Sequence, residues 1–212
     1  MSAVHRLIRR FTREVRESLP DIDTMSDEEL ALVLLAYAHF VAPNFVPWMV
    51  RTWINCRSEV AKEACRDNLV CEINEDHPAM LHRFVAPIQE RYLGICQIID
   101  DCLFDPLAVR SMEDLMTTGK GIDGLVVMAA LENTSLVFIP WIEKAAKRLG
   151  VTDLTYTQKH GVADEKHATQ FLEAVEAELP FEEDFHPSTA ISDVRNLLES
   201  IFLVNEYLQV CA

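Results

Sequence analysis

Apolar residues recur at helical spacing along almost the whole chain. Near the N-terminus, Leu7, Ile8, Phe11, Val15 and Leu19 fall on one face of a helix, because residues three and four apart lie side by side in an α-helix. We find no convincing run of alternating apolar and polar residues bounded by turn residues, which is the pattern of a half-buried strand. The sequence therefore predicts an all-α fold.

Capping and turn residues divide this periodic pattern into segments. Ser26 and Glu29 have the spacing of a capping box ahead of a strongly apolar segment, and Pro78 suits the first turn of a helix. Gly150 follows a basic run and is typical of a residue that ends a helix. The helices that we expect cover about 7–19, 30–40, 48–73, 78–103, 107–117, 122–149, 157–179 and 189–209. Residues 1–212 are thus predicted to form a single-domain helical bundle of about seven or eight helices.

The charge of the chain restricts its partners. The 212 residues include 34 acids and 19 bases, for a formal net charge of −15, and this charge repels nucleic-acid phosphates and anionic membrane surfaces. We expect no secretory signal, because no apolar run follows the N-terminal basic residues, and no uninterrupted apolar run approaches the roughly 18 residues of a membrane span. The six cysteines form no CxxC pair and indicate reduced thiols. We therefore expect a cytoplasmic protein that binds neither nucleic acid nor membrane.

Glu132 is the most informative charged residue. It lies in the apolar segment GLVVMAALENTSLVFIPW, with no Lys or Arg within one helical turn. A buried carboxylate costs several kcal/mol unless a positive group compensates it. Three explanations remain open at this point: a metal ion, an Arg from across the bundle, or a water-filled pocket.

The segment HGVADEKH brings further candidate ligands. At roughly 100° per residue, His160, Asp164 and His167 lie on one face of a helix, stacked over two turns. Glu72 and His82 also stand among apolar residues. Taken alone, Glu72 is more typical of a surface acid and His82 of a core histidine. His77 occupies the predicted helix break.

Together these residues supply three carboxylates and three imidazoles, a set that suits two divalent ions. The mixture of nitrogen and oxygen donors favours iron or manganese over calcium, and the lack of Cys ligands argues against structural zinc. A ferritin-like site would need two Glu-x-x-His motifs. Within the predicted helices only Asp164-x-x-His167 resembles such a motif, and this disfavours that site. The candidate metal ligands are Glu72, His82, Glu132, His160, Asp164 and His167.

Two segments resemble the haem-oxygenase-like di-metal oxidases. NLVCEINEDHPAMLH is similar to that family's Asn-Leu-x-x-Glu stretch with a later His, and HGVADEKH is similar to its His-x3-Asp-x2-His segment. Glu132 stands 28 residues before His160, at the family's mid-helix Glu position. The resemblance implies a haem-oxygenase-like bundle, often dimeric, in which two Fe(II) ions react with O2 through a peroxo-bridged di-iron(III) species. Family members oxidise amino acids, amines or fatty acids, and an external electron donor is an expected partner.

The resemblance leaves the small-molecule substrate open. Family members include one type that converts a tryptophan-like amino acid to a nitrile, which is our specific hypothesis, and N-oxygenation, desaturation or C–C cleavage are alternatives on the same site. Arg51 is a candidate anchor for a substrate carboxylate. Trp53 and Phe138 are candidate pocket aromatics, although core packing is the commoner role of such residues. His77 is a candidate for contact with the substrate. It could also contact the metal ligands without binding the metal itself, or be an ordinary loop residue.

Two other classes of function compete with the oxidase. A related thiaminase-like hydrolase would use a Cys nucleophile and no metal. A helical interaction protein would carry a structural or vestigial metal site and use its acidic surface to bind a basic partner.

Overall fold

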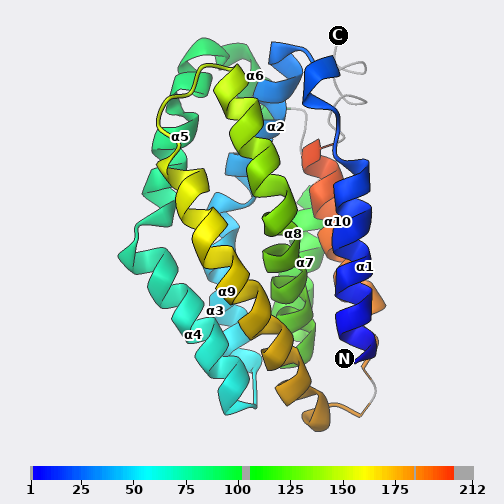
Figure 1. The fold of residues 1–212 in the computed structure, drawn as a ribbon. Coiled ribbons are helices and arrows are strands. Elements are labelled where there is room, and N and C mark those ends of the chain that lie inside the picture. Colours follow the sequence, from blue (N-terminus) through cyan, green and yellow to red (C-terminus); the bar gives the residue numbers. More distant parts are fainter. Residues whose placement is uncertain (1, 102–105, 184, 203–212) are drawn as a thin grey trace.

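The structure, a computed structural model, describes residues 2–101, 106–183 and 185–202. Within these ranges it contains ten α-helices, two short 3-10 helices and no strand, so the predicted all-α class is confirmed. The α-helices are α1 (Ala3–Ser18), α2 (Asp27–Phe40), α3 (Ala42–Asn55), α4 (Glu59–Asn74), α5 (His77–Arg91), α6 (Leu93–Asp101), α7 (Pro106–Thr118), α8 (Gly121–Arg148), α9 (Thr155–Glu178) and α10 (Ser188–Phe202) (Figure 1). The 3-10 helices are η1 (Ile22–Thr24) and η2 (Leu179–Phe181).

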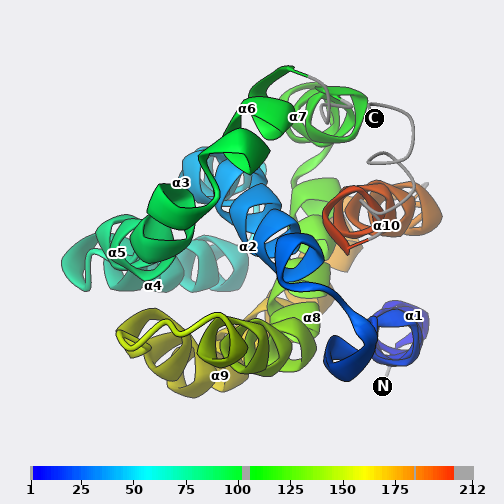
Figure 2. The same ribbon diagram turned by 90° about the horizontal axis from the view of Figure 1, so that it is seen from above.

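Helix α8 is the centre of the bundle. It packs against α1, α2, α3, α7, α9 and α10, which surround it when the molecule is viewed from above (Figure 2). Buried residues occur on all sides of this helix, as expected of a helix that is apolar all round. Gly124 allows α3 to approach closely, since a Cβ atom there would lie 2.6 Å from Oγ1 of Thr52. Residues 125–130 of α8 are accordingly fully buried.

Several local signals in the sequence are confirmed. The backbone N–H of Glu29 donates to Oγ of Ser26 at 3.1 Å, and the N–H of Ser26 donates to the Glu29 carboxylate at 2.6 Å, so the capping box is present. Gly150 follows α8 with φ of +84°, a left-handed conformation that glycine adopts without the steric cost of a Cβ atom. The helix predicted over 189–209 is observed as α10, and its last predicted residues lie outside the described range.

Two of the predicted helices were wrong in length, and each is divided in two. The helix expected over 48–73 is interrupted between α3 and α4, and the helix expected over 78–103 is interrupted at Tyr92. The first break has a clear cause in the buried carboxylate of Glu178. It accepts hydrogen bonds from the backbone N–H groups of Arg57 and Ser58 at 2.7 and 2.8 Å. Glu178 thus stabilises a new helix N-terminus, where backbone donors lack partners within the helix.

Two stretches have the length and composition of membrane-crossing helices, namely Asp27–Asn55 and Gly121–Arg148. The bundle buries 50% of the most apolar window in the first and 78% in the second. Core helices of a helical bundle pass the same test, so these stretches are weak evidence for membrane insertion.

Replacing Glu178 with Ala should destabilise the protein by about 2 to 4 kcal/mol, because two backbone donors, one of them buried, lose a charged acceptor. Urea unfolding followed by far-UV circular dichroism would measure this change. Glu173→Ala, on the exposed side of the same helix, should change stability by no more than about 0.5 kcal/mol. Equal effects of the two substitutions would show that Glu178 does not hold the α3–α4 junction.

Candidate metal centre

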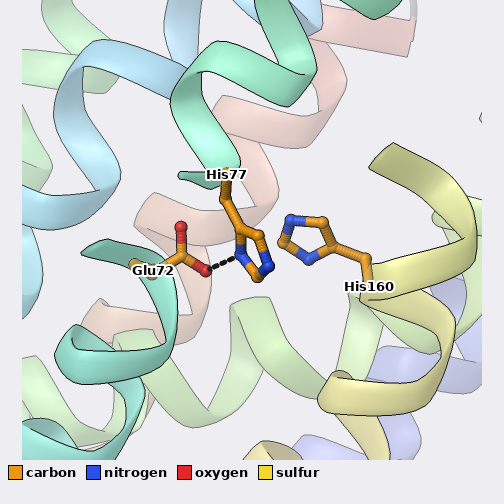
Figure 3. A group of neighbouring side chains, drawn as sticks. All are labelled: Glu72, His77 and His160. Carbon is orange, nitrogen blue, oxygen red and sulfur yellow. Dashed lines mark hydrogen bonds and ion pairs between the residues drawn. The ribbon is translucent and has the colours of Figure 1, made fainter. Parts of the chain in front are cut away.

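Glu72, His77 and His160 form the first of two candidate ligand groups, and each comes from a different helix (Figure 3). Glu72 lies near the end of α4, His77 begins α5, and His160 lies on α9. One potential ligand atom from each residue lies within 4.8 Å of the other two. The His77 and His160 rings face each other with their centroids 4.5 Å apart.

The turn between α4 and α5 places His77 in this group. Asp76 has φ of +56°, in the left-handed region, which Asp tolerates better than most residues other than Gly. His77 and Pro78 then form the start of α5. The turn directs the His77 ring back toward α4, where its Nδ1–H donates to Oε1 of Glu72 at 2.7 Å.

The structure corrects the prediction for His82. Its side chain is exposed, and it belongs to neither ligand group among the described residues. His77 and His82 are five residues apart on α5, about 140° around the helix, so only one of them can face α9. The residue that does so is His77, for which we had predicted contact with substrate.

Glu132, Asp164 and His167 form the second ligand group, and all three are buried. Glu132 lies in the middle of α8, and the other two lie on α9. Oε2 of Glu132 is 4.0 Å from Nδ1 of His167, and its Oε1 accepts a hydrogen bond from the Asn68 amide at 2.5 Å. Within the described part of the chain, no Arg or Lys forms an ion pair with Glu132, so the cross-bundle Arg that the sequence left open is not observed.

A direct contact joins the two groups. Nδ1–H of His160 donates to Oδ1 of Asp164 at 3.1 Å, one helical turn further along α9. The predicted shared face of His160, Asp164 and His167 is thus confirmed. His160 belongs to the first group, and Asp164 and His167 belong to the second. Three carboxylates and three imidazoles therefore lie in one contiguous cluster.

Electrostatics make this cluster costly without a cation. Burial, reinforced by the charges of Asp164 and Glu72, raises the pKa of Glu132 well above its usual value, although the Asn68 hydrogen bond opposes the shift. Burial lowers the pKa of His167 and so favours the neutral ring, which is the form that binds metal. Burial also disfavours the charged form of His77, but the hydrogen bond and charge of Glu72 prevail and raise its pKa.

Several buried polar atoms in the cluster lack a hydrogen-bond partner. They are Nε2 of His77, Nε2 of His160 and Oδ2 of Asp164. Since both histidines donate Nδ1–H to a carboxylate, the lone pair of each neutral ring lies on the unpartnered Nε2. Buried polar atoms are nearly always satisfied. The donor set and its unpaired atoms therefore fit metal ions.

A cavity of about 50 Å³, here called the inner cavity, adjoins both groups. Glu72, Glu132, His160 and Asp164 line it, and no Lys or Arg does so among the described residues. Its other walls are largely apolar. The polar exceptions are Ser135 and the pair Tyr37 and Tyr156, whose hydroxyls form a buried hydrogen bond of 2.6 Å. Space for a few water-sized molecules thus lies beside the candidate ligands.

The predicted substrate residues fare differently. Phe138 lines the inner cavity, as expected of a pocket aromatic. Arg51 does not line it, and instead forms an ion pair with Glu113 at 3.4 Å. Trp53 is 41% exposed and also lies away from the cavity. Arg51 and Trp53 flank Thr52, which is the buried position in this turn of α3, so the structure does not bring these two candidates to the inner cavity.

Sequence reasoning missed Asn68 and the tyrosine pair. Asn68 precedes Glu72 by four residues and so shares its helix face, a spacing that could have revealed its contact with the cluster. Tyr37 and Tyr156 are 119 residues apart in the chain, and no local pattern joins them.

No family model, curated protein or solved structure matches this chain.

Replacing Glu132 with Gln should stabilise the metal-free protein by about 1 to 4 kcal/mol at pH 7, since it removes a buried like charge and can keep the Asn68 hydrogen bond. A carboxyl whose pKa is raised on folding stabilises the fold at low pH, and this stability is lost as the pH rises from 4.5 toward the folded pKa. The difference between the variant and the wild type should therefore shrink toward pH 4. Urea unfolding in chelator at several pH values would test this.

Glu165→Gln is the matched control, because Glu165 is exposed on α9. It should leave the stability and its pH dependence nearly unchanged. Destabilisation by Glu132→Gln in chelator would show that the Glu132 charge is already compensated within the protein.

Proposed function

We propose that this chain binds two divalent transition-metal ions, preferentially iron, and uses them with O2 to oxidise a small organic substrate. The observation that carries the proposal is the contiguous cluster of buried carboxylates and imidazoles beside a cavity that no described Lys or Arg lines. Its three carboxylates would offset most of the +4 charge of two divalent ions. Such a cluster is expensive to bury for any purely structural role.

The composition of the groups supports iron or manganese. The first group has two His and one carboxylate, the ligand set typical of non-haem Fe(II) oxygenases. The second group has one His and two carboxylates, and so presents a harder, more negative set of donors. Neither group includes a thiolate, the ligand common in structural zinc sites.

The inner cavity supports chemistry on the substrate. When bound, two adjacent metal ions with open positions would supply the electrons and the binding site for O2. The apolar walls, with Leu131 and Phe138 beside the ligands, would exclude water and hold an apolar part of the substrate. The Tyr37–Tyr156 pair places hydroxyl groups in the wall of the same cavity.

The haem-oxygenase-like di-metal oxidases remain our proposal for the family. The ligand order along the chain supports it, with the change that His77, five residues after Glu72, takes the place of the later His. An amino-acid-like substrate, including one converted to a nitrile, is retained as a hypothesis because aromatic side chains line the inner cavity. An external donor would return the ions to the reduced state after each turnover.

The alternative hydrolase gains no support from the cysteines. Cys56 and Cys65 are buried near the α3–α4 junction, and none of the four described cysteines lines the inner cavity. A Cys nucleophile would need to reach substrate beside its general base.

Anaerobic titration of Fe(II) should distinguish the two histidines of α5. Wild-type protein should bind about two ions per chain, His77→Ala should lose about one, and His82→Ala should keep both, because only His77 lies in a ligand group. Iron analysis after gel filtration would measure the stoichiometry. Loss of iron from His82→Ala, with full loading of His77→Ala, would reverse the assignment made from the structure.

Oxygen consumption by the anaerobically loaded protein tests the function itself. An oxygen electrode should record uptake that scales with bound Fe(II), and protein loaded with Zn(II) should consume none, since zinc has no redox chemistry. Glu132→Ala should abolish the uptake together with metal binding. Two bound irons that leave O2 untouched with any reductant would favour a structural metal site.

A further inference from the structure

A second and larger cavity lies next to the metal centre. This outer cavity has a volume of about 530 Å³ and is bounded by α2, the start of α3, α5 and α6. Ala42, Pro78 and Leu81 line both cavities. Only a wall that includes these three side chains therefore separates the outer cavity from the space beside the ligands.

The two cavities differ in what they can hold. About 50 Å³ admits only a few heavy atoms, whereas the outer volume falls within the range of pockets for small organic ligands. A substrate of more than a few heavy atoms cannot fit entirely beside the metal ligands. Most of its body must lie in the outer cavity, with one end directed inward.

The polar lining of the outer cavity suits a negative group. Its nitrogen donors are His39, His82 and Gln89, and no carboxylate lines it among the described residues. His82 and Gln89 are seven residues apart on α5, so they lie on the same side of the helix. Both imidazoles are exposed and so stand where the cavity meets solvent. Hydrogen-bond donors and the absence of described lining acids allow this cavity to accept an anion, in a chain whose net charge of −15 repels anions elsewhere.

The inner cavity, toward which the inner end of a substrate would point, is mostly apolar. Apart from the ligands, the tyrosine pair and Ser135, the inner cavity is lined by aliphatic and aromatic side chains such as Val41, Phe45 and Leu131. The cluster itself already carries three carboxylates, which repel an incoming anion until metal ions are bound.

We propose that the outer cavity binds an organic carboxylate with an apolar body, whose carboxylate contacts His39 and His82 and whose apolar end passes Ala42, Pro78 and Leu81 toward the metal centre. The proposal of an anion site depends only on the residues that line the outer cavity. The orientation rests on the proposed function, and it means that oxidation occurs at a carbon remote from the carboxylate.

Calorimetric titration of the metal-free protein with octanoate and with octan-1-ol tests the anion site. Wild type should bind octanoate more tightly than the alcohol. The double variant His39→Ala/His82→Ala should weaken octanoate binding by about tenfold or more and alter binding of the alcohol by less than about threefold. His186→Ala is the control, because it removes an exposed imidazole outside the cavity. Unchanged octanoate affinity in the double variant would overturn the anion site.

Ala38→Phe tests the location, because Ala38 lines the outer cavity and not the inner one. The larger side chain should abolish binding of both probes and leave the iron stoichiometry at that of wild type, which also shows that the variant folds. Octanoate that still binds Ala38→Phe loaded with Mn(II), and that does not bind Glu132→Ala after the same treatment, would place the carboxylate beside the metal ligands and reverse the orientation.

Repeating the octanoate titration on Mn(II)-loaded protein separates the two proposals. A carboxylate held at His39 and His82 should bind with little dependence on metal, whereas one that coordinates the ions should bind much more tightly after loading. If the protein binds octanoate through the imidazoles but binds no iron, the proposal for the outer cavity holds and the proposed oxidase function is refuted.

Discussion

The burial of like charges around a small cavity is the constraint on which the rest of this structure depends. Glu72, Glu132 and Asp164 are each at least 94% buried, and among the described residues their partners are amides and imidazoles, with no Arg or Lys in contact. Charge is tolerated in a protein interior only when it is paired or when it coordinates an ion. The fold therefore holds a cluster of buried acids whose charge bound cations would offset.

The bundle meets this constraint by drawing the ligands from long, well-packed helices. Helices α8 and α9 lie side by side (Figure 1) and supply four of the six candidate ligands, so the geometry of these four is fixed by core packing. The remaining two come from either side of the α4–α5 turn. That turn depends on a left-handed Asp76, and the other end of α4 depends on the Glu178 cap. Rigid elements thus hold the second group, and a turn completes the first.

Features that depend on residues close together in the chain could be predicted from the sequence, and features that depend on distant residues could not. The common face of His160, Asp164 and His167 was predictable because it depends only on helical repeat. Glu132 was predictable as an unusual residue because its neighbours in the chain are apolar. His82 was predicted wrongly, since its apolar neighbours resemble those of a buried ligand, whereas the direction of α5 is set by the preceding turn. Arg51 and Trp53 do not line the inner cavity. The rotation of α3 about its axis depends on packing against α8, which the sequence near these residues does not reveal.

The sequence by itself determined the helical class, most helix ends and one complete ligand face, because periodicity, caps and prolines act over a few residues. Only the tertiary structure decided which helices break and which histidine meets Glu72. The α3–α4 junction is held by a carboxylate more than 100 residues away in the chain, and the two cavities meet where α3 and α5 converge. Contacts of that kind arise from packing, and no local pattern of residues encodes them.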